Sequence, residues 1–251
     1  MSWWRSAHTP EIDGAQLDAI IEQNVGLASR LAAPERELLA ALTVELLRAK
    51  DWEAANGFAL TPEITVTLAA NAAMPVLALG LGVYDRVHTI IVRPTAVRSS
   101  GLRSGPSAGT VSDDEVWTDG ISLPDRGPLA ISWDVARHES RHPSMGRNVI
   151  IHEFAHKIDM SDGLADGTPP LRGPSLANWV NLLADEYGHP EHRRSDDVLR
   201  PYAWANPAEF FAVATEAFFC IPLELRSAKA TLYRALADFY RQDPARQTDP
   251  A

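Results

Sequence analysis

Residues 148–159 read Asn-Val-Ile-Ile-His-Glu-Phe-Ala-His-Lys-Ile-Asp and place the pattern His-Glu-x-x-His between apolar residues. On an α-helix, residues four positions apart lie on one face, so His152 and His156 point their imidazoles at the same spot. Two such imidazoles supply half of a tetrahedral zinc site, and Glu153 can reach a metal-bound water without binding the metal itself. The stretch therefore predicts a buried helix that carries two zinc ligands and a catalytic base.

A second copy of the pattern, His138-Glu139-Ser-Arg-His142, precedes the first along the chain. Pro143 follows it directly, and a residue before proline is pushed away from helical geometry. Without a helix through both histidines, the four-residue spacing does not align their rings. Neighbouring arginines would also repel a cation. We therefore expect His138 and His142 to lie in a solvated loop and the metal to bind at residues 152–156.

A catalytic zinc site needs a third protein ligand. Residues 206–219 predict a helix that begins at a proline, is rich in phenylalanine and carries only two charged residues, Glu209 and Glu216. These glutamates are seven residues apart and share one face of the helix. A buried carboxylate face is costly unless a cation meets it, and that cation is either an arginine or lysine side chain or zinc. We expect Glu209 to be the ligand, with the reverse assignment open.

Two further carboxylates are candidates for supporting the ligands. Glu216 is expected either to hydrogen-bond a ligand or to be a structural acid. Asp159 lies three residues beyond His156 on the same side of the helix. It either accepts a hydrogen bond from the spare N–H of a ligand histidine, as such outer carboxylates commonly do, or simply ends the helix.

The remaining sequence predicts an α+β fold that is mostly helical, with a small mixed β-sheet beside the 148–159 helix. Helix start signals occur at Asp13, Pro34 and Thr61, each followed by apolar residues at helical spacing. The second of these helices has an apolar stripe that we expect to be buried, namely Leu38, Leu39, Leu42, Leu46 and Leu47. In the C-terminal helices, Tyr233 and Tyr240 are expected to reach the surface.

Strands are expected at 87–92, which is β-branched, and at 129–135, where apolar residues alternate with smaller or polar ones. An exposed edge of this sheet could align an extended peptide beside the metal. Residues 98–109 are rich in glycine and serine and predict a mobile loop.

We expect a single domain over 1–251, with a helical scaffold in about 1–80, a catalytic core in 81–244 and a loose tail in 245–251. The formal charge of −10 argues against non-specific attraction to nucleic acid or anionic membranes. Cys220 is the only cysteine, and no apolar run is long enough to span a bilayer. The composition therefore predicts a cytoplasmic protein that binds neither nucleic acid nor membrane.

Four segments resemble the Mlc titration factor A family of gluzincin-type zinc peptidases, which are related in their catalytic core to anthrax lethal factor. The resemblance runs from about Leu38 to Pro244 and is carried by residues 152–159, 166–171, 206–213 and 239–244. It implies a zincin-like fold and one zinc ion per chain. It further implies His152, His156 and Glu209 as the ligands and Glu153 as the base.

The same resemblance suggests further roles. In the lethal-factor-like site a tyrosine seven residues before the ligand glutamate assists catalysis, and Tyr202 stands at that spacing here. On the residues alone, an ordinary packed tyrosine after Pro201 is the favoured interpretation of Tyr202, and the resemblance reverses that order. The family also implies a peptidase of aminopeptidase type that acts on peptide or protein substrates. The alternative that it implies is a regulatory protein that sequesters a transcriptional repressor of the Mlc type.

Overall fold

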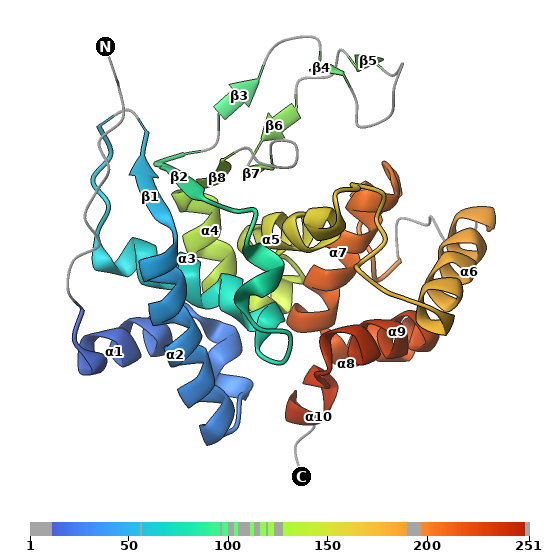
Figure 1. Cartoon of the computed structure of the whole chain (residues 1–251), viewed down its shortest axis with the longest axis horizontal. Coiled ribbons are helices and arrows are strands. Elements are labelled where there is room, and N and C mark those ends of the chain that lie inside the picture. The colour runs from blue at the N-terminus through green and yellow to red at the C-terminus, as the bar shows by residue number, and fades with distance from the viewer. Residues whose placement is uncertain are drawn as a thin grey trace.

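The computed structural model describes residues 12–248, except 56, 96, 100–102, 105–110, 113–115, 119, 123–127 and 190–196. Its α-helices are α1 (Gly14–Asn24), α2 (Ala33–Ala49), α3 (Pro62–Ala73), α4 (Trp133–Arg141), α5 (Val149–Asp159), α6 (Pro174–Gly188), α7 (Pro207–Cys220), α8 (Pro222–Ala228), α9 (Ala230–Tyr240) and α10 (Pro244–Thr248). Its strands are β1 (Asp51–Ala54), β2 (Thr89–Arg93), β3 (Val97–Ser99), β4 (Arg103–Ser104), β5 (Val111–Ser112), β6 (Val116–Thr118), β7 (Gly120–Ser122) and β8 (Leu129–Ser132). Helices form most of the body and the strands gather at the top of the view (Figure 1), so the α+β prediction is confirmed.

The main sheet has the strand order β1-β2-β8-β7, in which the first three strands are parallel and β7 is antiparallel to β8. Ile90 and Val92 on β2 are fully buried, as is Ile131, which lies opposite Val92 on β8. Helix α5 packs against β7 and β8, so the small mixed sheet lies beside the 148–159 helix as predicted. The short strand β1 was not predicted.

Helices α5 and α7 form the centre of the core and run antiparallel. The backbone N–H of Asn148, just before α5, contacts Glu216 near the end of α7, whereas His156 late in α5 lies near Glu209 at the start of α7. Phe154 of α5 is fully buried, and so are Phe210, Phe211 and Phe218 of α7. This apolar packing fixes the spacing between the two helices and hence between their polar side chains.

Local capping signals set the starts of the N-terminal helices. The Asp13 carboxylate accepts the Gln16 N–H at 2.8 Å, and the Thr61 hydroxyl accepts the Ile64 N–H at 3.4 Å. Helix α3 ends at Ala73, and a 3₁₀ turn over Met74–Val76, which contains Pro75, follows it. These helices pack onto α4 and α5 through α3.

The second predicted strand is too long. Strand β8 ends at Ser132 and helix α4 begins at Trp133. The alternation of apolar and polar residues over 133–135 is also compatible with a helix. Asp134 in the first turn favours the helix, because a negative charge near a helix N-terminus is stabilising. The predicted loop at 98–109 lies mostly outside the described residues.

Three smaller expectations also differ from the structure. Leu38 is 42% exposed, although the other leucines of its stripe are buried. Tyr233 and Tyr240 are buried because their hydroxyls have internal partners, the Asp243 carboxylate at 2.6 Å and the Thr215 hydroxyl at 2.9 Å. The expected loose tail is helical over Pro244–Thr248, and 249–251 lie outside the described residues.

Candidate metal centre

Helix α5 places the two histidines of the His-Glu-x-x-His pattern at one point in the interior. Its N-terminus is capped by the Asn148 side chain, whose oxygen accepts the Ile150 and Ile151 N–H groups at 3.2 Å each. His152 and His156 are each only 7% exposed, and their rings meet edge to face with centroids 4.8 Å apart. The apolar residues of α5 bury the helix on all sides, so these polar groups have little freedom to move.

Helix α7 brings Glu209 to the same point. The Asn206 side chain caps this helix by accepting the Glu209 N–H at 3.0 Å, so Glu209 lies in the first turn. Its side chain is 15% exposed and faces both imidazoles. Burial raises the pKa of Glu209, but contacts with both imidazoles outweigh burial and hold that pKa below its ordinary value.

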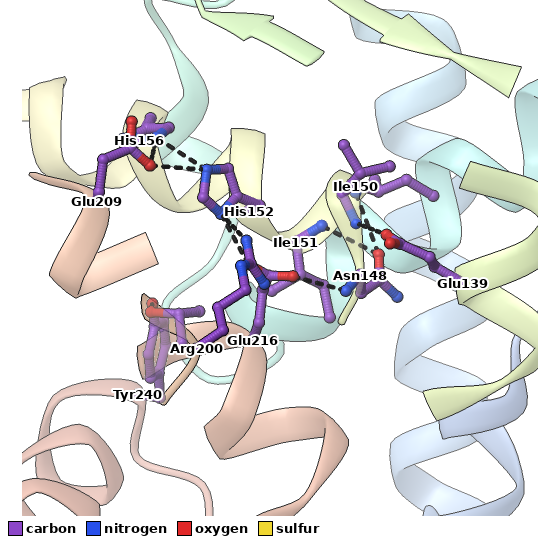
Figure 2. Close-up of polar contacts among 12 residues, drawn as sticks. Glu139, Asn148, Ile150, Ile151, His152, His156, Arg200, Glu209, Glu216 and Tyr240 are labelled. Atoms are coloured by element: carbon purple, nitrogen blue, oxygen red, sulfur yellow. Dashed lines mark hydrogen bonds and ion pairs between the residues drawn. The ribbon is translucent and has the colours of Figure 1, made fainter. Parts of the chain in front are cut away.

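The three side chains have the spacing of a metal site (Figure 2). The Nε2 atoms of His152 and His156 are 3.2 Å apart, and the Glu209 Oε2 atom lies 3.1 Å and 3.5 Å from them. A tetrahedral site with bonds of about 2.0–2.1 Å has ligand-to-ligand distances of about 3.3 Å. All three measured distances agree with that value. The described residues therefore fit a metal ion without rearrangement, and the structure brings together the three predicted ligands.

Glu216 lies directly behind His152 and is 1% exposed. Its Oε1 atom is 2.7 Å from His152 Nδ1 and 2.7 Å from Arg200 Nη2. Burial raises the pKa of Glu216, but His152 and Arg200 outweigh burial and lower it. An ionised carboxylate only accepts hydrogen bonds, so His152 Nδ1 carries a proton, and Nε2 is the ring atom that faces His156 and Glu209. Glu216 thus fixes the ring in the tautomer that a metal ligand requires.

Glu153 is 5% exposed, and its Oε2 atom has no hydrogen-bond partner among the described residues. Burial raises the pKa of this carboxyl, whereas the two neighbouring histidines oppose the rise. A carboxylate that binds a proton more readily than usual suits a general base that later returns the proton.

Tyr202 lies on a 3₁₀ turn, Pro201–Trp204, and is 47% exposed. Its ring centroid is 6.2 Å from that of His152, so the phenol borders the three candidate ligands. Burial and the Glu209 carboxylate raise the pKa of Tyr202, and the phenol therefore keeps its proton at neutral pH.

Asp159 at the end of α5 is fully buried and accepts the Gly167 N–H at 3.0 Å. Gly167 in turn accepts a hydrogen bond from the Trp179 indole at 2.9 Å. Its φ is +74°, and a Cβ atom at this position would lie 2.1 Å from the Pro207 carbonyl oxygen. Gly167 therefore joins the end of α5 to the start of α7 at a contact that admits no side chain.

A sequence model of the glucose-regulated metallo-peptidase M90 family matches residues 1–241. The chain belongs to this family. An uncharacterised protein of Synechocystis sp. is 33% identical over 230 residues, which cover 90% of this chain and 83% of that protein. Mlc titration factor A of Yersinia pestis and that of Yersinia pseudotuberculosis are each 30% identical over 236 residues, which cover 88% of this chain and 83% of theirs. The predicted resemblance to the Mlc titration factor A family is confirmed, and M90 membership supports a metal-dependent peptidase.

In this M90 chain the other His-Glu-x-x-His copy is partly helical. His138 lies in α4, contrary to expectation, whereas His142 lies just beyond the end of this helix and directly before Pro143, so no helix runs through both histidines, as predicted. Both rings are exposed, with centroids 4.6 Å apart, and no third ligand-type side chain groups with them in the described part of the chain. Glu139 instead points inward, where it accepts the Val149 N–H at 2.6 Å and caps α5.

Three residues of the M90 site were missed by sequence reasoning. Arg200 holds Glu216, Glu139 caps α5, and Asn71 of α3 accepts a hydrogen bond of 2.8 Å from the Asn148 side-chain amide. Asn71 thereby orients the amide whose oxygen caps α5, and it brings the N-terminal helices into contact with the site. The three contacts join residues 16, 10 and 77 positions apart, beyond the reach of helix or strand periodicity, so no pattern of neighbouring residues predicts them. Among the described residues, no helix is long and apolar enough to cross a membrane.

Proposed function

We propose that this chain is a zinc-dependent peptidase in which His152, His156 and Glu209 hold the metal. The observation that carries the proposal is the set of three distances among their ligand atoms, 3.1, 3.2 and 3.5 Å, which fit a tetrahedral site. Two neutral imidazoles and one carboxylate are a ligand set typical of catalytic zinc, and three protein ligands leave a fourth position for water or substrate.

The charges around the centre also favour a divalent cation. Glu153, Glu209 and Glu216 are all largely buried near the imidazoles. Arg200 contacts Glu216, and the buried Lys157 acts on Glu153, so the described residues supply two cationic side chains for three carboxylates. Excess buried carboxylate is costly without a compensating positive charge. Zinc in the position that the three ligand atoms surround would supply that charge.

Zinc, when bound, would lower the pKa of a coordinated water to near 7 and polarise the substrate carbonyl. Glu153 takes the proton of the attacking water and delivers it to the leaving amine, a role that its raised pKa supports. Tyr202, kept protonated, donates a hydrogen bond to the carbonyl oxygen as negative charge develops there. Glu216 holds His152 in place during the reaction.

Aminopeptidase action is the finer part of the proposal, and it rests on the resemblance to the Mlc titration factor A family. Such an enzyme removes residues only from peptides with a free terminal amine. We further propose that residues 1–251 form one peptidase domain, because Asn71 of the N-terminal helices contacts Asn148 at the cap of α5.

A second candidate function is regulatory. The Yersinia relatives are named Mlc titration factor A, and that name indicates an interaction with the Mlc repressor in those proteins. We propose, as the alternative, that this chain binds a repressor of the same type and that hydrolysis is secondary. Binding would then survive loss of the catalytic base.

The experiment that tests both is a comparison of wild type with Glu153→Gln. Metal content is measured together with hydrolysis of matched fluorogenic peptides with free and blocked N-termini. One zinc per chain in both proteins, with hydrolysis lost only in the variant, is expected, and cleavage limited to free amines would support an aminopeptidase. Bound zinc without hydrolysis of any peptide would favour the regulatory alternative. A wild-type chain that binds no zinc would refute the proposal.

A further inference from the structure

Residues 197–204 form the segment that delivers Arg200 and Tyr202 to the metal centre. Tyr202 is 47% exposed, so its own packing contributes little to its position. The segment is held instead by Leu199 and Ala203, which are fully buried. The Tyr202 phenol lies between the two ends of this segment, Asp197 and Trp204. It keeps one position only if both ends are anchored.

Lys229 contacts both of these ends. It lies between helices α8 and α9, and its Nζ atom is 3.2 Å from the Asp197 carboxylate and 5.7 Å from the centre of the Trp204 ring. The same Nζ atom is 2.8 Å from Glu186 on α6. The lysine side chain is only 9% exposed, and each carboxylate is 11% exposed. One largely buried ammonium group thus joins α6, the α8–α9 junction and both ends of the 197–204 segment.

Tyr187, the neighbour of Glu186 on α6, strengthens the same attachment. Its hydroxyl donates to the Ala203 carbonyl oxygen at 3.3 Å, and its ring packs edge to face on Trp204 at 5.6 Å. The Asp197 carboxylate also accepts the Leu199 N–H at 2.9 Å. The segment is therefore attached to α6 and to the junction of α8 and α9.

We propose that Lys229 is a positioning residue for Tyr202, acting through its contacts with Asp197 and Trp204. The inference rests on the proposed peptidase function, because it concerns the placement of the phenol at the metal centre. A displacement of about 1 Å in a group that must meet the reacting carbonyl can lower the rate by about a hundredfold. An anchor remote from the chemistry can therefore control the rate, although the described contacts of the Lys229 ammonium group are with Glu186, Asp197 and Trp204 and not with the candidate ligands.

A purely structural ion pair would give a different result from a positioning residue. Loss of a structural pair lowers stability and affects catalysis equally, whatever residue stands at 202. Loss of a positioning residue affects catalysis only while the positioned group is present. A double-mutant cycle on kcat with Lys229→Met and Tyr202→Phe separates these two cases.

We expect Lys229→Met to lower kcat roughly tenfold in the wild-type background and by less than about twofold in the Tyr202→Phe background. Metal content should stay at the wild-type level in all four proteins. Lys50→Met is the matched control, because Lys50 is also ordered, donating to the Tyr84 carbonyl oxygen at 2.8 Å, but lies outside the 197–204 attachment. It should leave kcat unchanged. An equal loss from Lys229→Met in both backgrounds would overturn the proposal.

Lys229→Met leaves two largely buried carboxylates without their cation and could fail to fold. Asp197→Asn is the milder variant, since it keeps the acceptor for the Leu199 N–H and leaves Lys229 paired with Glu186. We expect it to lower kcat by a smaller factor that also disappears with Tyr202→Phe. A loss that persists in that background would count against positioning.

A measurement independent of activity is hydrogen exchange at the Ala203 and Ala205 amides, which donate to Arg200 and Tyr202 carbonyl oxygens at 2.9 and 3.1 Å. We expect Lys229→Met to speed exchange at both while the amides of α5 stay protected. Unchanged exchange would overturn the anchoring.

If exchange rises but wild type hydrolyses no peptide, the proposed function fails and the anchoring stands. If wild type is a zinc peptidase that Tyr202→Phe does not impair, the function stands and the positioning is overturned.

Discussion

Replacing Glu216 by glutamine tests whether the carboxylate behind His152 sets the affinity for metal. Among the residues that the structure describes, this carboxylate has three hydrogen-bond or ion-pair partners, and all three are donors: His152 Nδ1, Arg200 Nη2 and the Asn148 N–H, at 2.7, 2.7 and 2.8 Å. Two carboxylate oxygens accept from all three. A glutamine has one accepting oxygen, so its NH₂ group must face at least one of these donors. The substitution keeps the shape of the side chain but forces one contact between two donors.

The expected effect is a loss of metal affinity. Removing the hydrogen-bond partner of a ligand histidine typically weakens metal binding by about 10- to 100-fold, or about 1.4–2.7 kcal/mol. At a fixed excess of zinc, the stabilisation by metal should fall by about the same amount. Competition with a chelator of known affinity measures the first quantity, and denaturant unfolding with and without zinc measures the second.

Glu139→Gln is the matched control for Glu216→Gln. Both glutamates accept a backbone N–H at the start of α5, but Glu139 contacts Val149 and touches no candidate ligand. We expect the zinc affinity of Glu139→Gln to stay within about twofold of wild type, because the residues that strongly affect metal affinity are those that directly contact a ligand. Glu216→Gln with wild-type affinity, or equal losses in the two variants, would refute the reasoning.

Two further predictions concern the frame of the site. Gly167→Ala should lower the melting temperature and weaken zinc binding, because its methyl group would overlap the Pro207 carbonyl at the start of α7. Gly163→Ala is the control: Gly163 lies in the left-handed region (φ +102°), and a Cβ there would make only an ordinary contact of 3.5 Å with the Arg86 side chain. It should cost only the left-handed strain of about 1–2 kcal/mol, so equal losses in the two variants would contradict this account. Burial and the Glu216 charge raise the pKa of Glu139 from 4.5 to about 7. Between pH 4.5 and 7 the folded chain therefore binds more protons than the unfolded chain, so the contribution of Glu139 makes the free energy of unfolding fall as pH rises through this range. Glu139→Gln should remove that part of the slope in unfolding measured from about pH 5 to 8, and an unchanged slope would show that Glu139 does not carry it.

Local signals explain why much of the fold was predicted. The caps at Asp13 and Thr61 act on N–H groups within three residues, so the starts of α1 and α3 follow from neighbouring residues alone. Pro207 and the capping Asn206 likewise start α7 where expected. The failures occur where one pattern fits two structures. Residues 133–135 alternate like a strand, but the chain leaves the sheet after Ser132 and continues as a helix.

The choice between the two His-Glu-x-x-His copies shows how far local reasoning extends. The sequence favours residues 152–156 because apolar neighbours can bury that helix, and α5 is indeed buried. It wrongly places His138 in a loop, whereas His142 lies beyond the end of α4, and both are exposed as expected. It also leaves open which glutamate of α7 faces the imidazoles. The structure places Glu209 near both Nε2 atoms and Glu216 behind His152, which supports the proposed assignment of Glu209 as ligand.

The sequence by itself determined the helix that carries His152, Glu153 and His156 and the relative orientation of their side chains, because these depend on the pitch of a single helix. Only the tertiary structure decided how Glu209 meets the two imidazoles and how Arg200 and Glu216 lie behind them. These contacts join residues 48 to 68 positions apart, so they depend on how α5 and α7 pack rather than on any neighbouring residue. That packing comes from buried apolar side chains, which set the distance between helices but leave no polar motif in the sequence.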